Sequence, residues 1–267
     1  MVQPIGFIDS GVGGLTVVRE ALKQLPNESI IYLGDSARCP YGPRPQEEVK
    51  QFTWEMVRFL LEKKVKMIVI ACNTATAVAL DEIRANVSVP VIGVIHPGSL
   101  AAIKKTKTGK IAVLGTQGTI QSGVYEKILK EKNHQVMITN IACPKFVTLV
   151  ESSQRHSSIA KKVVAETLQP IVHGQVDTVI LGCTHFPLLR SAIQNVVGEN
   201  VQLIDSGAET LTAVSTLLDY FNIAATYEEN PTPRHDYYTT SSPELFKSLA
   251  EDWLGREIHV EKVKITE

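Results

Sequence analysis

Two short segments combine residue types that could carry out proton transfer. Cys72-Asn73-Thr74 and Cys183-Thr184-His185 each come directly after an apolar run rich in Ile and Val. A cysteine has a reference pKa of about 8.5, so a few per cent of it is thiolate at neutral pH. A helix that begins directly after the cysteine would raise that fraction. A thiolate accepts a proton and a thiol donates one, so two such cysteines could exchange a proton across one carbon atom.

The two cysteines occupy equivalent places in an internal repeat. Residues 5–20 align with residues 111–126, and each of these segments predicts a strand, a glycine-rich polar turn and a helix. Residues 68–77 align with residues 179–188, with a cysteine at the same place in both. Because the two matches occur in the same order, duplication is the better explanation. If the halves face each other about a pseudo-two-fold axis, both thiols point into one interface.

Alternating strands and helices must position these segments. Runs of Ile and Val without polar alternation are typical of strands covered on both faces. They predict strands over residues 5–8, 29–33, 67–71, 91–94, 111–114, 136–140, 178–181 and 201–204. Apolar residues at helical spacing predict a helix over residues 46–63. In the tail, strands are expected over residues 237–240 and 258–265, around a helix that begins near Ser242 and ends at Gly255.

This pattern predicts an α/β fold of two pseudo-symmetric doubly wound domains with largely parallel sheets and the active site at their interface. We expect the first half over residues 1–97, completed by residues 208–267, and the second half over residues 98–207.

Nearly every reactive side chain follows a predicted strand directly. In open α/β sheets, ligands bind outside the carboxyl ends of the strands. Besides the two cysteine segments, the residues expected at these ends are Asp9, Ser10, Asp35, Ser36, Thr116, Thr119, Asp205 and Ser206. Asp, Ser and Thr at such places also cap helices, which is the interpretation we favour for Asp205-Ser206. Cysteine is not a preferred cap, so capping is not expected to explain Cys72 or Cys183.

Composition excludes several classes of protein. The chain has 267 residues, a formal net charge of −1, a hydrophobic fraction of 44% and four cysteines. These values argue against global disorder and against a disulfide scaffold. The near-zero charge gives no electrostatic case for a nucleic-acid or membrane partner. No signal-peptide pattern opens the sequence and no apolar stretch is long enough to span a membrane, so we expect a cytoplasmic protein with reduced thiols.

Metal and dinucleotide chemistry are not favoured by the motifs. Cys183 and His185 are two residues apart, Cys39 and Cys143 stand alone, and no CxxC pattern exists. Residues 9–14 are glycine-rich and follow a strand, but Thr16 stands where a dinucleotide fingerprint requires glycine. We therefore expect neither a metal nor a cofactor.

Six motifs in order resemble those of a known family. DSGVGG, LGDSARCPYG, ACNTAT, LGTQGT, LVE and GCTH, spread over residues 5–218, are similar to the motifs of the bacterial glutamate racemases, cofactor-independent enzymes of the Asp/Glu racemase family. Lys145 and Thr148 depart from the usual pattern near the LVE motif, at positions that look peripheral. The resemblance implies a racemase that interconverts L- and D-glutamate and supplies D-glutamate for peptidoglycan, and with it cell wall biogenesis and cell shape. It also implies a homodimer.

The resemblance assigns catalytic roles to five residues. Cys72 would deprotonate D-glutamate with help from Asp9, and Cys183 would deprotonate L-glutamate with help from His185. Glu151 matches the acidic residue of the LVE motif, although a carboxylate at a helix start is an equally good interpretation. The alternatives left open are a racemase or isomerase of another small acid such as aspartate, and a non-catalytic amino-acid-binding module.

Substrate binding would rely on hydroxyls, one amide and backbone N–H groups, which suit two carboxylates. No arginine or lysine occurs in the two cysteine motifs. The residues implied to bind the substrate are Asp9, Ser10, Tyr41, Gly42, Asn73, Thr74, Thr116, Thr119, Thr184 and His185.

Overall fold

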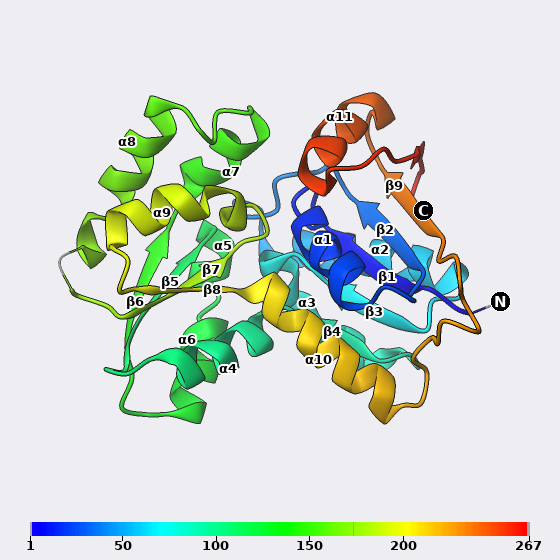
Figure 1. Ribbon diagram of the computed structural model, residues 1–267, viewed down its shortest axis with the longest axis horizontal. Helices are drawn as coiled ribbons and strands as arrows, with labels where there is room; N and C mark the ends of the chain where they lie inside the picture. Colours follow the sequence, from blue (N-terminus) through cyan, green and yellow to red (C-terminus); the bar gives the residue numbers. More distant parts are fainter. Residues whose placement is uncertain (1, 173, 266–267) are drawn as a thin grey trace.

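Two parallel β-sheets form the frame of the protein, whose structure is a computed structural model describing residues 2–172 and 174–265. Figure 1 shows one sheet in each half of the view. The first sheet has the strand order β10-β9-β2-β1-β3-β4. Its strands are β1 (Ile5–Asp9), β2 (Ile30–Gly34), β3 (Met67–Ile70), β4 (Val91–Gly93), β9 (His235–Thr239) and β10 (Val260–Lys262).

The second sheet repeats the central strand order of the first. Its order is β6-β5-β7-β8, which matches β2-β1-β3-β4 strand for strand. The strands are β5 (Lys110–Gly115), β6 (Met137–Ala142), β7 (Thr178–Gly182) and β8 (Gln202–Asp205). All pairings in both sheets are parallel. The predicted α/β fold with two similar, parallel sheets is therefore confirmed.

Helices cover both faces of each sheet, which explains the continuous apolar runs of the strands. On the first sheet, α2 and α3 cover one face and α1, α10 and α11 cover the other (Figure 1). On the second sheet, α4 and α6 lie opposite α7, α8 and α9. The helices are α1 (Leu15–Gln24), α2 (Gln46–Glu62), α3 (Asn73–Asn86), α4 (Ile95–Lys105), α5 (Gln117–Gln121), α6 (Val124–Lys132), α7 (Pro144–Glu151), α8 (Ser158–Thr167), α9 (Arg190–Val197), α10 (Ser206–Tyr220) and α11 (Pro243–Leu254), with 3₁₀ turns η1 (Gln169–Ile171) and η2 (Phe186–Leu189).

Two helices link the sheets. Helix α4 follows β4 of the first sheet but packs against β7 and α6 of the second, and α10 packs against both α1 and α4. The predicted boundaries, after residues 97 and 207, fall in the first turns of these two helices. The division into 1–97 with 208–267 and 98–207 stays a prediction.

The tail extends the first sheet. The hydroxyl of Ser242 accepts a hydrogen bond from the Leu245 N–H at 3.3 Å and caps α11, and Gly255 ends the helix with a φ of 68°. Strand β9 lies beside β2 and β10 lies beside β9, both in parallel register. The expected strand–helix–strand order is correct, although the last strand is only three residues long.

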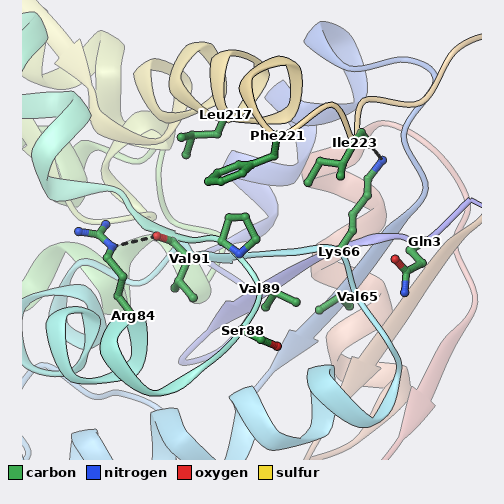
Figure 2. Close-up of a pocket in the computed structure, with 11 residues that line it drawn as sticks. Gln3, Val65, Lys66, Arg84, Ser88, Val89, Val91, Leu217, Phe221 and Ile223 are labelled. Carbon is green, nitrogen blue, oxygen red and sulfur yellow. Dashed lines mark hydrogen bonds between the residues drawn. The ribbon is translucent and has the colours of Figure 1, made fainter.

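A pocket of about 660 Å³ lies at the amino ends of β3 and β4, away from the polar strand ends (Figure 2). Figure 2 shows Leu217 of α10 and Phe221, directly after this helix, on one side of it and Val89 and Val91 on the other. Lys66 donates a hydrogen bond to the carbonyl of Ile223 at 2.6 Å along its edge. None of the predicted site residues lines this pocket. Among residues 2–172 and 174–265, no helix is both long and apolar enough to cross a membrane.

Candidate active site

The loops that follow the strands of both sheets meet at one small cavity. It lies at the carboxyl ends of β1, β3, β5 and β7, where ligands of parallel sheets bind. Both Cys72 and Cys183 are in its wall. The complete lining is Ser10, Cys39, Pro40, Tyr41, Gly42, Cys72, Asn73, Thr74, Thr116, Val147, Cys183, Thr184 and His185. Of the other predicted residues, Asp9, Thr119 and Glu151 lie behind this wall and hydrogen bond to residues in it.

Cys72 is the N-cap of α3. Its sulfur accepts a hydrogen bond from the Ala75 N–H at 3.4 Å, so the expectation that capping could not explain this cysteine is wrong. The Ala75 N–H lowers the pKa of the thiol, as expected at a helix start, but burial has the larger and opposite effect. Burial, together with the charge of Asp9, raises the pKa of the Cys72 thiol to about 12. Cys72 is therefore held as a thiol, the form that donates a proton.

Cys183 lies at the end of β7 and is paired with a histidine. Its sulfur is 3.7 Å from His185 Nδ1, and His185 Nε2 is 2.9 Å from Glu151 Oε1. Burial lowers the pKa of His185, but its hydrogen bonds to Cys183 and Glu151 outweigh this effect and raise the pKa above its ordinary value. An imidazolium beside the sulfur is an electrostatic partner for a thiolate. No helix begins directly after Cys183, contrary to expectation: the 3₁₀ turn η2 follows three residues later.

Asp9 joins the two sheets behind the cavity. One of its carboxylate oxygens accepts from the Gly11 N–H at 3.1 Å, and the other accepts from the Thr184 hydroxyl at 3.4 Å. The side chain is completely buried, and this burial raises its pKa to about 6 although His185 works in the opposite direction. Its charge acts on Cys72. Asp9 is thus placed to respond to the protonation of Cys72 and of His185.

Gly13 allows the loop after β1 to touch the loop after β7. A Cβ atom at this position would lie 2.3 Å from Thr184 Oγ1 and 2.5 Å from His185 Cε1. We expect Gly13→Ala to lower the free energy of unfolding by ~1–3 kcal/mol, the usual cost of an overpacked contact. Urea unfolding followed by circular dichroism measures this change. An unchanged denaturation midpoint would show that the loops can separate without cost.

A cluster of three threonines closes the cavity between the sheets. Thr74, at the start of α3, lies 2.9 Å from Thr116 Oγ1 and 3.2 Å from Thr119 Oγ1. Thr116 caps α5 by accepting from the Thr119 N–H at 3.2 Å. Thr74 and Thr116 line the cavity, whereas Thr119 supports them from behind.

Tyr41 is held in place through Asp35. Its hydroxyl donates to Asp35 Oδ2 at 2.5 Å, and Arg38 Nε donates to the same oxygen at 2.7 Å. Asp35 therefore shapes the loop that presents Tyr41 and Gly42 to the cavity. Because the Tyr41 hydroxyl gives its hydrogen to Asp35, this hydroxyl is not available as a donor to a ligand carboxylate.

Some site contacts gave no signal in the sequence. Cys39 lines the cavity, and its sulfur lies 3.9 Å from Glu151 Oε1; its peptide bond to Pro40 is cis. The indole of Trp253 in α11 packs edge-to-face on the His185 imidazole at 5.8 Å between centroids. Only the folded chain brings these residues together, since no local pattern links positions so far apart in the sequence.

The cavity is too small for an amino acid in this conformation. Its volume is about 20 Å³, which is room for about one water molecule. A larger ligand therefore requires the loops of the two sheets to separate. Within the described part of the chain, no group of three or more His, Cys, Asp or Glu side chains is arranged to hold a metal ion.

Similarity to known proteins defines the class of this one. Residues 5–214 match the family described as Asp/Glu/Hydantoin racemase. Proteins named glutamate racemase from Carnobacterium sp. (strain St2) and Enterococcus faecalis (strain ATCC 700802 / V583) are 60% identical over 252 residues and 63% identical over 255 residues. The alignments cover 94% of this chain and 94% of the first relative, and 96% of this chain and 93% of the second.

Solved structures agree with this match. A glutamate racemase isoform from Bacillus anthracis has a TM-score of 0.95 at 48% identity, over 98% of this chain and 97% of that one. A glutamate racemase from Francisella tularensis in complex with D-glutamate has a TM-score of 0.91 at 33% identity, over 98% of each chain. The chain belongs to the Asp/Glu/Hydantoin racemase family. It is an amino-acid racemase, and hence an isomerase rather than a non-catalytic binding module.

Proposed function

We propose that this racemase interconverts L- and D-glutamate by proton transfer between two cysteines. The observation that carries the proposal is the placement of Cys72 and Cys183 in the wall of one cavity, each after the equivalent strand of its sheet. The choice of glutamate is supported by the names of the similar proteins and by the D-glutamate bound to the Francisella tularensis relative.

The charges around the two sulfurs favour one starting state. We assign removal of the α-proton of L-glutamate to Cys183, whose sulfur lies 3.7 Å from His185 Nδ1, and proton donation to Cys72, whose thiol pKa is raised by burial. The Cys183 thiolate takes the α-proton of L-glutamate, and the electron pair of the broken C–H bond remains on the α-carbon. The Cys72 thiol then donates its proton to the opposite face and becomes a thiolate. The product is D-glutamate, and the reverse reaction begins from the Cys72 thiolate.

The remaining wall residues suit a substrate with two carboxylates. Hydroxyls of Ser10, Thr74, Thr116 and Thr184 and the amide of Asn73 line the cavity. We propose that they bind the carboxylates together with backbone N–H groups near Gly42. Donors at the α-carboxylate would also stabilise the negative charge that develops as the α-proton leaves.

The proposal extends to the setting of the reaction. D-Glutamate made in the cytoplasm would supply peptidoglycan synthesis, and through it cell wall biogenesis and cell shape. We propose that the protein acts as a homodimer without a cofactor, a metal, a nucleic acid or a membrane. We also propose that the halves 1–97 with 208–267 and 98–207 move apart to admit the substrate.

The direct test follows the α-proton of glutamate. L-Glutamate in deuterated water should lose its circular dichroism signal while solvent deuterium replaces its α-proton. Folded protein that produces neither change would contradict the proposal. L-Aspartate is the control substrate, and faster racemisation of aspartate would show that the substrate has been chosen wrongly.

Glu151 should support His185 through its hydrogen bond. We expect Glu151→Gln to lower kcat about tenfold, because a hydrogen bond between charged groups is worth ~1.5 kcal/mol or more. Without the carboxylate the pKa of His185 falls, so the imidazolium loses its proton at lower pH. The alkaline limb of the pH–rate profile therefore shifts to lower pH. Exposed Glu199→Gln serves as the control. An alkaline limb in its original position would exclude this role for Glu151.

A further inference from the structure

Tyr125 reaches from the second sheet to the first catalytic segment. It lies in α6, is 2% exposed, and donates its hydroxyl hydrogen to Asn73 Oδ1 at 2.7 Å. The same hydroxyl oxygen lies 2.8 Å from Ser206 Oγ, at the start of α10. Asn73 and Ser206 are buried as well. Asn73 directly follows Cys72, so the Tyr125 hydroxyl binds the residue next to a proposed catalytic cysteine.

In the structure the Asn73 amide faces Tyr125 with its oxygen. A phenol has a single hydrogen to donate, and Tyr125 donates it to Asn73, so the Ser206 hydroxyl is the donor to Tyr125. The amide oxygen of Asn73 therefore points towards Tyr125. The amide nitrogen projects to the other side of the same planar group, and among the described residues it donates to no protein acceptor. Because Asn73 lines the cavity, its two N–H donors are available to a ligand there.

We propose that Tyr125 is a positioning residue that keeps the Asn73 amide turned with its NH₂ group towards a substrate carboxylate. This inference rests on the proposed function, in which Asn73 binds glutamate. Without the phenol hydroxyl the amide is free to rotate, and its oxygen would then face a carboxylate oxygen. Two acceptors in contact repel each other, so the rotated amide weakens binding where the correct one strengthens it.

The surroundings of Tyr125 are built around its ring and hydroxyl. A Cβ atom at Gly182, next to Cys183, would lie 3.1 Å from Tyr125 Cε2 and 2.6 Å from the Leu114 carbonyl oxygen. A Cβ atom at Gly98 would lie 2.5 Å from Ser206 Oγ. Glycine at both positions leaves the space that the tyrosine and the serine occupy. Burial raises the pKa of Tyr125, so its hydroxyl remains a donor throughout the pH range of an assay.

Tyr125→Phe tests the inference, because it removes the hydroxyl and keeps the ring. We expect KM to rise about tenfold for both enantiomers, since the amide contact acts on bound substrate and transition state alike. We expect kcat to fall less than about threefold and the effect to be independent of pH. Ser206→Ala is the matched control: it leaves the Tyr125–Asn73 bond in place and should change KM less than about twofold.

A double-mutant cycle distinguishes positioning from a general loss of structure. If Tyr125 acts through Asn73, Tyr125→Phe should raise KM no further in an Asn73→Ala background. Asn73→Asp tests the direction of the amide without altering Tyr125, and should raise KM at least as much as Asn73→Ala. Urea unfolding verifies that each variant is folded. The inference would be overturned if the fold-increases in KM of Tyr125→Phe and Asn73→Ala multiplied in the double variant. An unchanged KM in Asn73→Asp would overturn it as well.

The outcomes also separate this inference from the proposed function. If the protein racemises glutamate and Asn73→Ala raises KM while Tyr125→Phe does not, the proposed function stands and the role of Tyr125 is wrong. If the unaltered protein does not racemise glutamate, the proposed function itself fails.

Discussion

Replacing either Cys72 or Cys183 with serine is expected to lower racemisation at least about a thousandfold while the fold is retained. Serine has nearly the same size, and both side chains are only 6% exposed, so packing changes little. A serine hydroxyl, however, is a far weaker acid than a thiol and neither gives nor takes the α-proton efficiently. Loss of a positioned acid or base costs ~10²–10⁴ in rate, and here the same group serves as both.

Isotope effects assign each cysteine to one face of the substrate. The equilibrium constant between the enantiomers is one, so kcat/KM must fall equally in both directions for each variant. The slow step nevertheless differs. In Cys183→Ser, removal of the α-proton of L-glutamate becomes slow, so the effect of α-deuteration should grow with L-glutamate. With D-glutamate the slow step is proton return, so the solvent isotope effect should grow instead.

Cys72→Ser should show the mirror image of this pattern. Identical patterns in the two variants would contradict the assignment of the cysteines to opposite faces. Cys143→Ser is the matched control, because Cys143 is buried at the end of a strand but does not line the cavity. It should keep its racemase rate within about threefold, whatever it costs in stability.

The sequence predicted the strands, the helices and the sheet edge that carries the candidate site better than it predicted the pKa values there. Periodicity and the internal repeat located the strands and put Cys72 and Cys183 at equivalent strand ends, because these depend on local residue order. Burial depends on what packs on a residue from elsewhere in the chain. For this reason the raised pKa of Cys72 and the capping role of its sulfur could not be read from the motif.

Contacts between the sheets were also beyond the sequence. Asp9 accepts from Thr184, Tyr125 donates to Asn73, and Trp253 packs on His185 only because two sheets and a tail helix converge. Each partner lies in a segment whose local pattern is already explained by its own helix or strand. The sequence pattern of each segment therefore gives no indication of the residue that it contacts in the other sheet or in the tail helix.

The proposed reaction requires Asp9 to be charged, whereas burial in the folded protein disfavours the charged form of its carboxyl group. We expect Asp9→Asn to lower racemisation about a hundredfold, because the buried carboxylate assists proton movement at Cys72. Activity of the unaltered protein should also fall as the pH drops through about 6, where Asp9 takes up a proton. Asp205→Asn is the control: this half-buried aspartate caps α10, its pKa is also raised by burial, and it lies outside the cavity lining.

The same substitution should stabilise the protein near neutral pH. Asp9 has a pKa of about 6 when folded, against about 3.9 when unfolded, so stability from its protonated form is lost as the pH rises from about 4 through 6. Above that range the buried charge costs ~3 kcal/mol. Asn carries no charge, but it accepts one hydrogen bond fewer, and this loss lowers the free energy of unfolding by ~1 kcal/mol. Urea unfolding near pH 8 should therefore show a gain of ~2 kcal/mol that disappears near pH 4. A variant that loses activity without this pH-dependent gain would mean that Asp9 is not charged in the folded protein.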